Sequence, residues 1–550
     1  MAVKKNDLIN LNILEMTSQG VGIGKHEGLV IFVPSSCSGD IVNVKILKVK
    51  KSYAFAKIQK VIEYSKNRVS IDCPVYLKCG GCSLRHIDYE YELRVKEQKV
   101  KDNILRIGGI SDVCIKRIVP SPKVNYYRNK SQIPIGTNNE NIVELGFFAL
   151  HSHRIVECEN CLLQPLFFSD IIKSFKKWAI KYKISTYDEK THNGILRNLY
   201  IRYAEKTDEV MVCIVVNSNS KIKNEDELLA ILKSEVKNLK TVIVNYNTND
   251  TNVILGQKCR TIYGDGYITD IICNLKFNIS PLSFFQVNRA QAENLYNKAI
   301  EYANITKDDI ILDLYCGTGT IGLTMASRAK KLIGVEIVED AIINARNNCN
   351  LNNITNAEFI CSDAKSAVQR LKARGESPSV VILDPPRKGC DIDTISTIAE
   401  MKPKRVVYIS CDSATLSRDL KEFNNKGFKP IEITPFDMFP RTSHVETVVL
   451  LGRKMVDDRN IEYEYVDYEP KDNEYMRNTK GSATYAEIKL WIKEQYNVSV
   501  SNLYIAQVKD SCGFEKRENY NTGAEGHKVP QCPDEKRKMI LEAFKHFRMI

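Results

Sequence analysis

Cys411 stands where a thiol could do chemistry. It lies two residues after the short apolar run 406–409, which predicts a buried strand, and Asp412 and Ser413 after it can begin a helix. A cysteine at the end of a strand can be inert packing. It can also be a nucleophile whose thiolate attacks an electrophilic carbon. The residues elsewhere in the chain must decide between these two interpretations.

Three further cysteines, Cys73, Cys79 and Cys82, form the array C-x5-C-G-G-C, whose two glycines let the backbone wrap closely around a ligand. Three thiolates need a fourth ligand, and we expect Cys161 of "CENCLLQP" to supply it, with Cys158 as its competitor. Four thiolates suit zinc or an iron–sulfur cluster. Because paired C-x2-C motifs are the commoner zinc pattern, the three-plus-one spacing favours a [4Fe–4S] cluster, and structural zinc is the alternative.

Acidic residues end three successive predicted strands. Segment 310–323, "IILDLYCGTGTIGL", predicts a strand ending in Asp313, a glycine-rich loop and a helix; the next strand ends in Glu336, and the third reaches Asp363. Such a loop lets the backbone approach a nucleoside-like ligand, and a carboxylate about twenty residues later can accept hydrogen bonds from ribose. The pattern predicts an S-adenosylmethionine site. A nicotinamide site is the alternative, since G-x-G-x-x-G also occurs in dinucleotide folds.

The elements that would position these residues are read from periodicity. From about residue 285, helices alternate with buried strands, which is typical of a doubly wound parallel sheet whose strand ends share one edge. That edge would bring Cys411 close to the cofactor loop. The fourth strand runs into "DPPRKG", where Arg387 stands in the place of the aromatic residue used in amino-group methylation and argues against that chemistry.

A chain of 550 residues is too long for one core. We predict a multidomain protein, and its parts are an OB-like β-barrel (1–63), a mixed α+β domain (64–285), an α/β Rossmann-like domain (286–455), a charged linker (456–480) and a small C-terminal α/β module (481–550). The α+β domain contains a long helix at about 88–107. The C-terminal module is predicted to hold a strand in "VSVSNLYIAQVK", between two helices.

The net charge of +12 weakly favours a polyanionic partner. Lysines interleaved with Tyr53 and Phe55 on the predicted barrel strands suit RNA, and a solvated lysine face is the alternative. The first residues lack the apolar stretch of a signal peptide, and no run of about 18 apolar residues occurs. We therefore expect a cytoplasmic protein without a membrane partner, whose cysteines are reduced.

Five motifs together closely resemble the RNA uracil-5-methyltransferases, which use S-adenosylmethionine: "SFFQVN", "DLYCGTGTIGL", "DPPRKG", "YISCDSATLSRDL" and "HVETVVLL". The iron–sulfur-containing branch that modifies 23S ribosomal RNA also has the C-x5-C-G-G-C array and an N-terminal TRAM barrel. The resemblance covers roughly residues 7–453. It implies that the helix at 88–107 packs on the catalytic domain, which makes the central domain discontinuous.

The resemblance also implies roles for particular residues. Cys411 matches the nucleophile that adds to C6 of uracil, and Glu446 matches the carboxylate that removes the C5 proton. Asp384 matches a residue between cofactor and target base. The cofactor site would be lined by Gln286, Tyr315, Glu336, Asp384, Thr320 and Asp363, and the [4Fe–4S] cluster would be bound by Cys73, Cys79, Cys82 and Cys161.

The predicted function is therefore C5-methylation of uridine in 23S ribosomal RNA by a monomeric enzyme. The same chemistry on the T-loop of transfer RNA is a close alternative. From a different class, the chain could be an RNA-binding or redox module with an inactive catalytic domain. The joint presence of Cys411, Glu446 and Asp384 argues against that.

Overall fold

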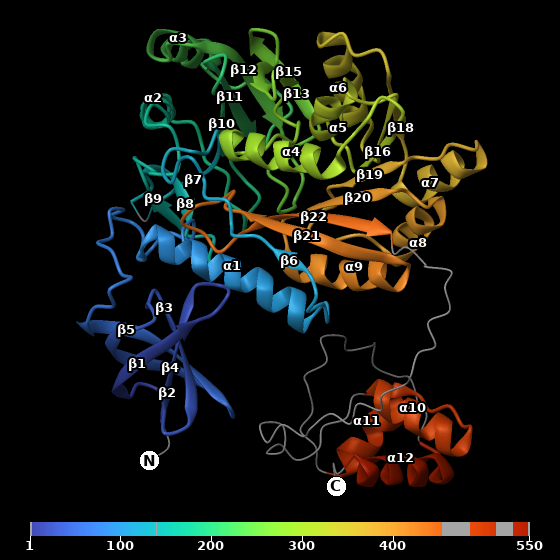
Figure 1. The fold of residues 1–550 in the computed structure, drawn as a ribbon. Coiled ribbons are helices and arrows are strands. Elements are labelled where there is room, and N and C mark those ends of the chain that lie inside the picture. The colour runs from blue at the N-terminus through green and yellow to red at the C-terminus, as the bar shows by residue number, and fades with distance from the viewer. Residues whose placement is uncertain (1–2, 139, 454–484, 513–531, 548–550) are drawn as a thin grey trace. The chain divides into compact units, whose positions relative to one another are not determined.

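A computed structural model describes residues 3–138, 140–453, 485–512 and 532–547 (Figure 1). The chain divides into two compact units, Met1–Val456 and Asp457–Ile550. The first unit contains a barrel and two large sheets, and the second contains helices. Within the described residues, no helix is both long and apolar enough to cross a membrane.

The N-terminal strands close into a barrel in the order β1-β2-β3-β5-β4. Alternate residues of β4, such as Val42, Val44 and Ile46, point into the barrel and are fully buried, as the period of two in a strand requires. Lys45 and Lys57 are paired across β4 and β5. The five strands are β1 (Leu8–Met16), β2 (Val21–His26), β3 (Leu29–Pro34), β4 (Ile41–Val49) and β5 (Tyr53–Glu63).

The central sheet has seven strands in the order β13-β12-β11-β10-β7-β8-β9. Its outer face is covered by α2 (Phe168–Lys181) and α3 (Glu225–Glu235), which share a core with the strands around Trp178. The strands are β7 (Lys130–Thr137), β8 (Val143–Phe148), β9 (Ile155–Glu157), β10 (Leu196–Ala204), β11 (Glu209–Val216), β12 (Leu239–Tyr246) and β13 (Lys258–Tyr263).

The third sheet has eight strands in the order β18-β17-β16-β19-β20-β22-β21-β6. Neighbours from β18 to β20 are parallel, and β22 is antiparallel to both β20 and β21. The strands are β6 (Cys114–Ile115), β16 (Ile310–Leu314), β17 (Lys331–Glu336), β18 (Ala357–Cys361), β19 (Val380–Leu383), β20 (Arg405–Ser410), β21 (Phe428–Phe436) and β22 (Glu446–Arg453). The predicted parallel α/β sheet is therefore present, with an antiparallel hairpin at one side.

Helices cover both faces of this sheet (Figure 1). Along β20, Val407 and Ile409 face one core, while Val406 and Tyr408 face the other. The first core includes α4 (Arg289–Ala303), α5 (Thr320–Ala326) and α6 (Glu339–Leu351). The second includes α1 (Tyr89–Arg106), α7 (Ala364–Ala373), α8 (Ile392–Met401) and α9 (Ser413–Asn425). The inner strands β16, β17, β19 and β20 are buried on both sides, which explains their nearly continuous apolar sequences.

Residues 89–115 join the third sheet although they precede the central sheet in the chain. The helix α1 packs against α9, and the two-residue strand β6 pairs with β21 at the sheet edge. A hairpin, β14 (Ile268–Ile272) and β15 (Leu275–Ile279), lies between the large sheets and contacts β10, β11 and α6. One continuous core therefore spans both sheets.

The C-terminal unit corrects the predicted α/β module. Its described residues form three helices, α10 (Tyr485–Tyr496), α11 (Asn502–Ser511) and α12 (Asp534–His546). The segment predicted as a strand folds instead into α11. Ile505 and Val508, three residues apart, both point into a small core with Ile540 and Phe544. That helical spacing outweighs the β-propensity of the preceding valines. The predicted linker 456–480 lies outside the described residues.

Candidate active site

One cavity of about 960 Å³ opens at the carboxyl ends of the parallel strands. This position agrees with the general rule that open α/β sheets bind ligands beyond the carboxyl ends of their strands. All the catalytic and cofactor residues predicted from the sequence line it except Thr320: Cys411, Glu446, Gln286, Tyr315, Glu336, Asp384 and Asp363. The fold therefore brings together side chains from positions 286 to 446.

Cys411 and Glu446 are placed by two neighbouring strands. Ser410 at the end of β20 pairs with Thr447 near the start of β22, so Cys411 and Glu446 lie one residue beyond this pair at the same sheet edge. Directly after Cys411, the Asp412 carboxylate accepts hydrogen bonds from the first backbone N–H groups of α9. This cap fixes the turn, so the thiol is held between a rigid strand and a rigid helix.

The ionisable neighbours of the thiol are mostly acidic. Burial, together with Glu446 and Asp384 and against the opposing effect of Arg387, raises the pKa of Cys411 to about 11. Burial, together with the Asp384 charge, raises the pKa of Glu446 to about 8, again opposed by Arg387. Burial alone raises the pKa of Asp384 to about 7. Carboxyl groups with pKa values near neutrality can both accept and donate protons, which is what acid–base catalysis requires.

The glycine-rich loop after β16 forms the cofactor side of the cavity. Tyr315 and Gly317 both have left-handed backbone conformations, with φ of 64° and 54°. Glu336 supports this loop, since its carboxylate accepts a hydrogen bond from the Gly317 N–H at 3.2 Å. Behind the loop, buried Asp313 accepts one from Gly322 at 2.9 Å and does not line the cavity. The loop is thus held by two carboxylates, and its backbone borders the cavity.

Thr320 and Asp363 differ in where the structure places them. Thr320 begins α5, and its hydroxyl lies 3.3 Å from the Tyr296 hydroxyl, away from the cavity lining. Asp363 caps α7 by accepting a hydrogen bond from Ser366 N–H at 2.9 Å, and it does line the cavity. Of these two residues, only Asp363 can contact a bound ligand without rearrangement.

The cavity also contains residues that the sequence analysis did not assign to the site. Phe284 lines its mouth with 64% of its side chain exposed, and Phe439, His444 and Arg418 line it as well. Phe284 belongs to the quoted "SFFQVN" motif, so the motif held a signal for it. His444 begins the quoted "HVETVVLL" and Arg418 lies in "YISCDSATLSRDL", so these motifs held a signal for them as well. Phe439 lies outside the five motifs, and only the folded chain reveals its place.

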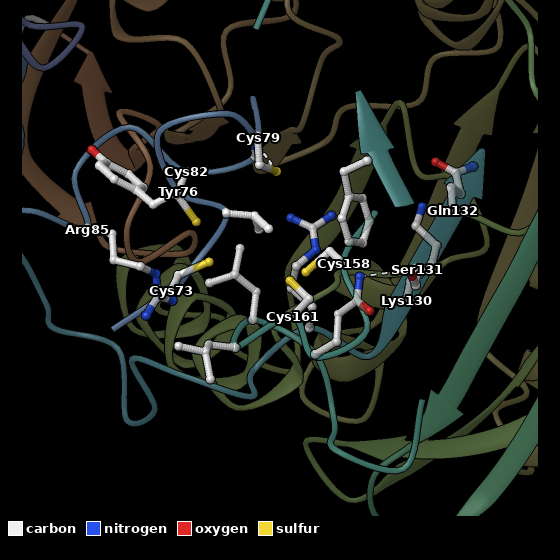
Figure 2. A pocket seen from close by; sticks show the side chains of 17 residues that line it. Cys73, Tyr76, Cys79, Cys82, Arg85, Lys130, Ser131, Gln132, Cys158 and Cys161 are labelled. Carbon is white, nitrogen blue, oxygen red and sulfur yellow. Dashed lines mark hydrogen bonds between the residues drawn. The ribbon is translucent and has the colours of Figure 1, made fainter. Parts of the chain in front are cut away.

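A second cavity has a volume of about 220 Å³. Five cysteines line it, Cys73, Cys79, Cys82, Cys158 and Cys161 (Figure 2). The first three lie before α1, and the last two follow β9, so the cavity joins segments far apart in sequence. Burial, helped by neighbouring thiols, raises the pKa of Cys82 to about 11 and that of Cys158 to about 12. Arg85 opposes the shift at Cys82.

The donors of this cysteine pocket fit an iron–sulfur cluster. Thiolates are the usual ligands of such clusters, and the basic side chains of Arg85, Arg128 and Lys130 line the same cavity. Burial lowers the pKa of Lys130 to about 7, so the two arginines are the main positive charges that would offset a thiolate-bound cluster. Gly80 lets the array approach β8 closely, because a Cβ there would lie 3.1 Å from the Phe148 carbonyl oxygen. Over the described ranges, no three His, Cys, Asp or Glu side chains converge tightly enough to hold a single metal ion.

Comparison with known proteins identifies two matching families. Residues 225–454 match the tRNA (Uracil-5-)-methyltransferase family, and residues 3–58 match the TRAM domain. An uncharacterized RNA methyltransferase of Clostridium tetani is 43% identical over 449 residues, covering 82% of this chain and 97% of the relative. One from Bacillus cereus is 41% identical over 451 residues, covering 82% and 98%.

A solved structure resembles this chain as well. It is the Pyrococcus abyssi tRNA (uracil-54, C5)-methyltransferase in complex with S-adenosyl-L-homocysteine. The match has a TM-score of 0.64 and 28% sequence identity, and it covers 80% of this chain and all of that one. The likeness extends over most of the described part of the first unit.

Proposed function

Since the chain belongs to the RNA uracil-5-methyltransferases and is an S-adenosylmethionine-dependent enzyme of that family, we propose that it methylates a uridine of 23S ribosomal RNA with Cys411 as nucleophile and Glu446 as base. The observation that carries the catalytic assignment is their juxtaposition. Both side chains line one cavity at the same sheet edge, with Asp384 beside them.

The chemistry of uracil explains why both groups are needed. C5 of uracil is too weak a nucleophile to take a methyl group unaided. Addition of the Cys411 thiolate to C6 forms a carbon–sulfur bond and moves an electron pair toward C5, which becomes an enolate carbon. S-adenosylmethionine supplies the methyl group as an electrophile. Glu446 then takes the C5 proton, and the electron pair of that C–H bond expels the thiolate and restores the C5–C6 double bond.

Proton placement follows from the electrostatics of the cavity. With pKa values of about 11 and 8, Cys411 and Glu446 both hold their protons in the empty cavity at neutral pH. Each must be deprotonated at its own step. Arg387 lowers the pKa of both groups, so we propose that it favours the reactive thiolate and carboxylate.

For the cofactor we propose Gln286, Tyr315, Glu336 and Asp384 as the main binding residues and Asp363 as a weaker one. All line the cavity beside the glycine-rich loop. Thr320 has less support, since its hydroxyl faces Tyr296. For the cysteine pocket we propose a [4Fe–4S] cluster bound by Cys73, Cys79, Cys82 and Cys161, a staple of the fold near the RNA-binding surface.

The choice of ribosomal RNA as substrate rests on the cysteine array. The five thiols around one cavity support the cluster-containing branch, which acts on 23S ribosomal RNA. The T-loop of transfer RNA is the second candidate, because the similar Pyrococcus abyssi enzyme is a tRNA (uracil-54, C5)-methyltransferase. In either RNA the target base must be unpaired or flipped out, since stacking shields C6.

Two experiments test these proposals. Purified enzyme incubated with 5-fluorouridine RNA should form a denaturant-stable protein–RNA adduct, because fluorine at C5 cannot leave as a proton. Cys411→Ala should form none, and an adduct retained by that variant would refute the nucleophile assignment. Mapping of 5-methyluridine in a knockout strain should show its loss from 23S ribosomal RNA. Loss from transfer RNA instead would favour the second candidate.

A further inference from the structure

The loop 437–445 joins β21 to β22 and leads directly into Glu446. Phe439 and His444 of this loop line the catalytic cavity. Cys411 is held by β20 and the capped start of α9, which lie outside this loop. The position of Glu446, in contrast, depends on how firmly the loop closes the hairpin, since β21 and β22 pair as far as Phe436 and Glu446.

Arg441 connects this loop to the segment that carries the cysteine array. Its carbonyl oxygen accepts hydrogen bonds from the backbone N–H groups of Ser83 and Leu84, at 2.9 and 3.0 Å, directly after Cys82. Its own N–H donates to Glu92 of α1 at 2.7 Å, and its guanidinium donates to the Ile87 carbonyl at 3.0 Å. Arg441 also has a φ of 68°, a conformation that side chains other than glycine rarely adopt unless the surroundings hold them there.

A buried ion network continues these contacts. The Lys96 ammonium donates to Glu92 and to Asp437 at 2.7 Å each and to the Phe439 carbonyl at 3.1 Å. The Tyr89 hydroxyl donates to Asp437 at 2.8 Å. The Lys96, Glu92 and Asp437 side chains are at most 1% exposed, so none of these charges can exchange its partner for water.

Other parts of the fold bind three more carbonyls of the loop. Those of Met438, Pro440 and Ser443 accept hydrogen bonds from Asn288, Tyr127 and Lys99, respectively, at 3.0 to 3.1 Å. The loop therefore takes its shape from residues outside it.

We propose that Arg441 is a positioning residue for the methylation reaction. Together with Ser83, Leu84, Glu92, Lys96 and Asp437 it forms a clasp, which we call the Arg441 clasp, that fixes loop 437–445 so that Glu446 reaches the C5 proton. This proposal rests on the proposed role of Glu446. The clasp acts on the proton-removal step, whereas addition of Cys411 and transfer of the methyl group depend on elements outside the loop.

The test uses Arg441→Gly, because glycine adopts the same φ without strain. The substitution removes the guanidinium contacts with Ile87 and Glu92, and it also gives the loop backbone more conformational freedom. We expect release of tritium from [5-³H]uridine RNA to fall on the order of tenfold to hundredfold, as for other small misplacements of a catalytic group. The methylated, denaturant-stable adduct should accumulate on ordinary uridine RNA, and Arg441→Lys should restore part of the release rate. Lys183→Gly is the matched control, because Lys183 is an exposed cation with a φ of 50°.

Two results would overturn the proposal. Tritium release at the rate of the Lys183→Gly control, without adduct, would overturn the proposal. So would an equal loss of adduct formation, methyl transfer and release, which indicates a general defect. If Arg441→Gly does not fold, as judged by thermal melting, Tyr89→Phe offers a second test. It removes the hydrogen bond that Asp437 of the clasp accepts from the Tyr89 hydroxyl, together with the one from Ser121 N–H to that hydroxyl, and should give the same pattern more weakly. Glu446→Gln separates the two proposals: it should trap the methylated adduct, and its failure to do so would refute the role of Glu446 itself.

Discussion

The catalytic cavity and the cysteine pocket both contain thiols whose pKa is raised by burial, Cys411 in the first and Cys79, Cys82, Cys158 and Cys161 in the second, but the charges around them differ. Around Cys411 the neighbours are the carboxyl groups of Glu446 and Asp384 with Arg387 opposing them. Around the five pocket cysteines, the basic lining residues that the structure describes are Arg85, Arg128 and Lys130. Carboxylates beside a thiol exchange protons with it and with a substrate, whereas cations beside several thiolates offset the charge of a bound cluster. The neighbours thus decide the use to which the same side chain is put.

Removing the Cys411 thiol from the catalytic cavity should have the largest effect on activity. Cys411→Ala is expected to lower kcat by about 10⁴- to 10⁶-fold, the range seen when a covalent nucleophile is removed. Methyl incorporation from labelled S-adenosylmethionine would measure it. Cys114→Ala, at an exposed thiol on β6, should keep full activity. Residual activity in Cys411→Ala within about tenfold of the unaltered enzyme would contradict a covalent mechanism.

Substitutions in the cysteine pocket should abolish cluster binding. Cys79→Ser is expected to lose most of the bound iron and sulfide, because a serine hydroxyl is a poor ligand for iron–sulfur clusters. Iron and acid-labile sulfide analysis of the anaerobically purified protein would measure the loss, with Cys259→Ser as a control at an exposed thiol outside the pocket. One zinc per protein molecule and no iron in the unaltered protein would show that the pocket holds zinc instead.

The fifth cysteine sharpens this prediction. Cys158 and Cys161 both line the pocket, and only one is needed as the fourth ligand. Cys161→Ser should lose iron as Cys79→Ser does, while Cys158→Ser should keep most of it. The reverse result would identify Cys158 as the ligand.

Activity should depend on pH through the ionisable groups of the catalytic cavity. Because burial raises the pKa of Glu446 to about 8 and that of Cys411 to about 11, and both act without their protons, kcat/KM should rise with pH. Below pH 8 the rise should be about tenfold per pH unit or steeper. A kcat/KM profile that stays flat between pH 6 and pH 9 would contradict these raised pKa values, because kcat/KM reports the protonation of the free enzyme.

The cofactor side should show the smallest effects. Glu336→Gln is expected to weaken S-adenosylmethionine binding by about tenfold, since it removes a charged acceptor that also holds the loop at Gly317. Thr320→Ala should change the affinity by less than about twofold, because its hydroxyl faces Tyr296. Calorimetric titration with S-adenosylmethionine would compare the two. A larger effect at Thr320 would mean that α5 rearranges when the cofactor binds.

Sequence patterns predicted the parallel sheet because its signals are local. Strands such as 406–409 are short, apolar and followed by a helix start, and the residues that line the cavity stand at their carboxyl ends. The Arg441 clasp could not be predicted in this way. Nothing in the sequence around Ser83 or Arg441 predicts that they touch. Their contact exists because α1, which follows Ser83, packs on the eight-stranded sheet. The sequence predicted a strand where α11 forms, because the valines just before the helix favour β-structure. The helical spacing of Ile505 and Val508, which both enter the small core, was the better signal.

The docking of α1 on α9 also has a consequence during protein synthesis. Asn103 of α1 donates a hydrogen bond to Ser413, 310 residues further along the chain. At the usual rates of translation, about 15 to 60 s pass between the synthesis of these two residues. During that interval Leu93, Val100 and Ile104, which are buried in the finished sheet core, have no partner surface to cover them. This apolar face of α1 therefore lacks its native cover until the last strands of the sheet have been synthesised.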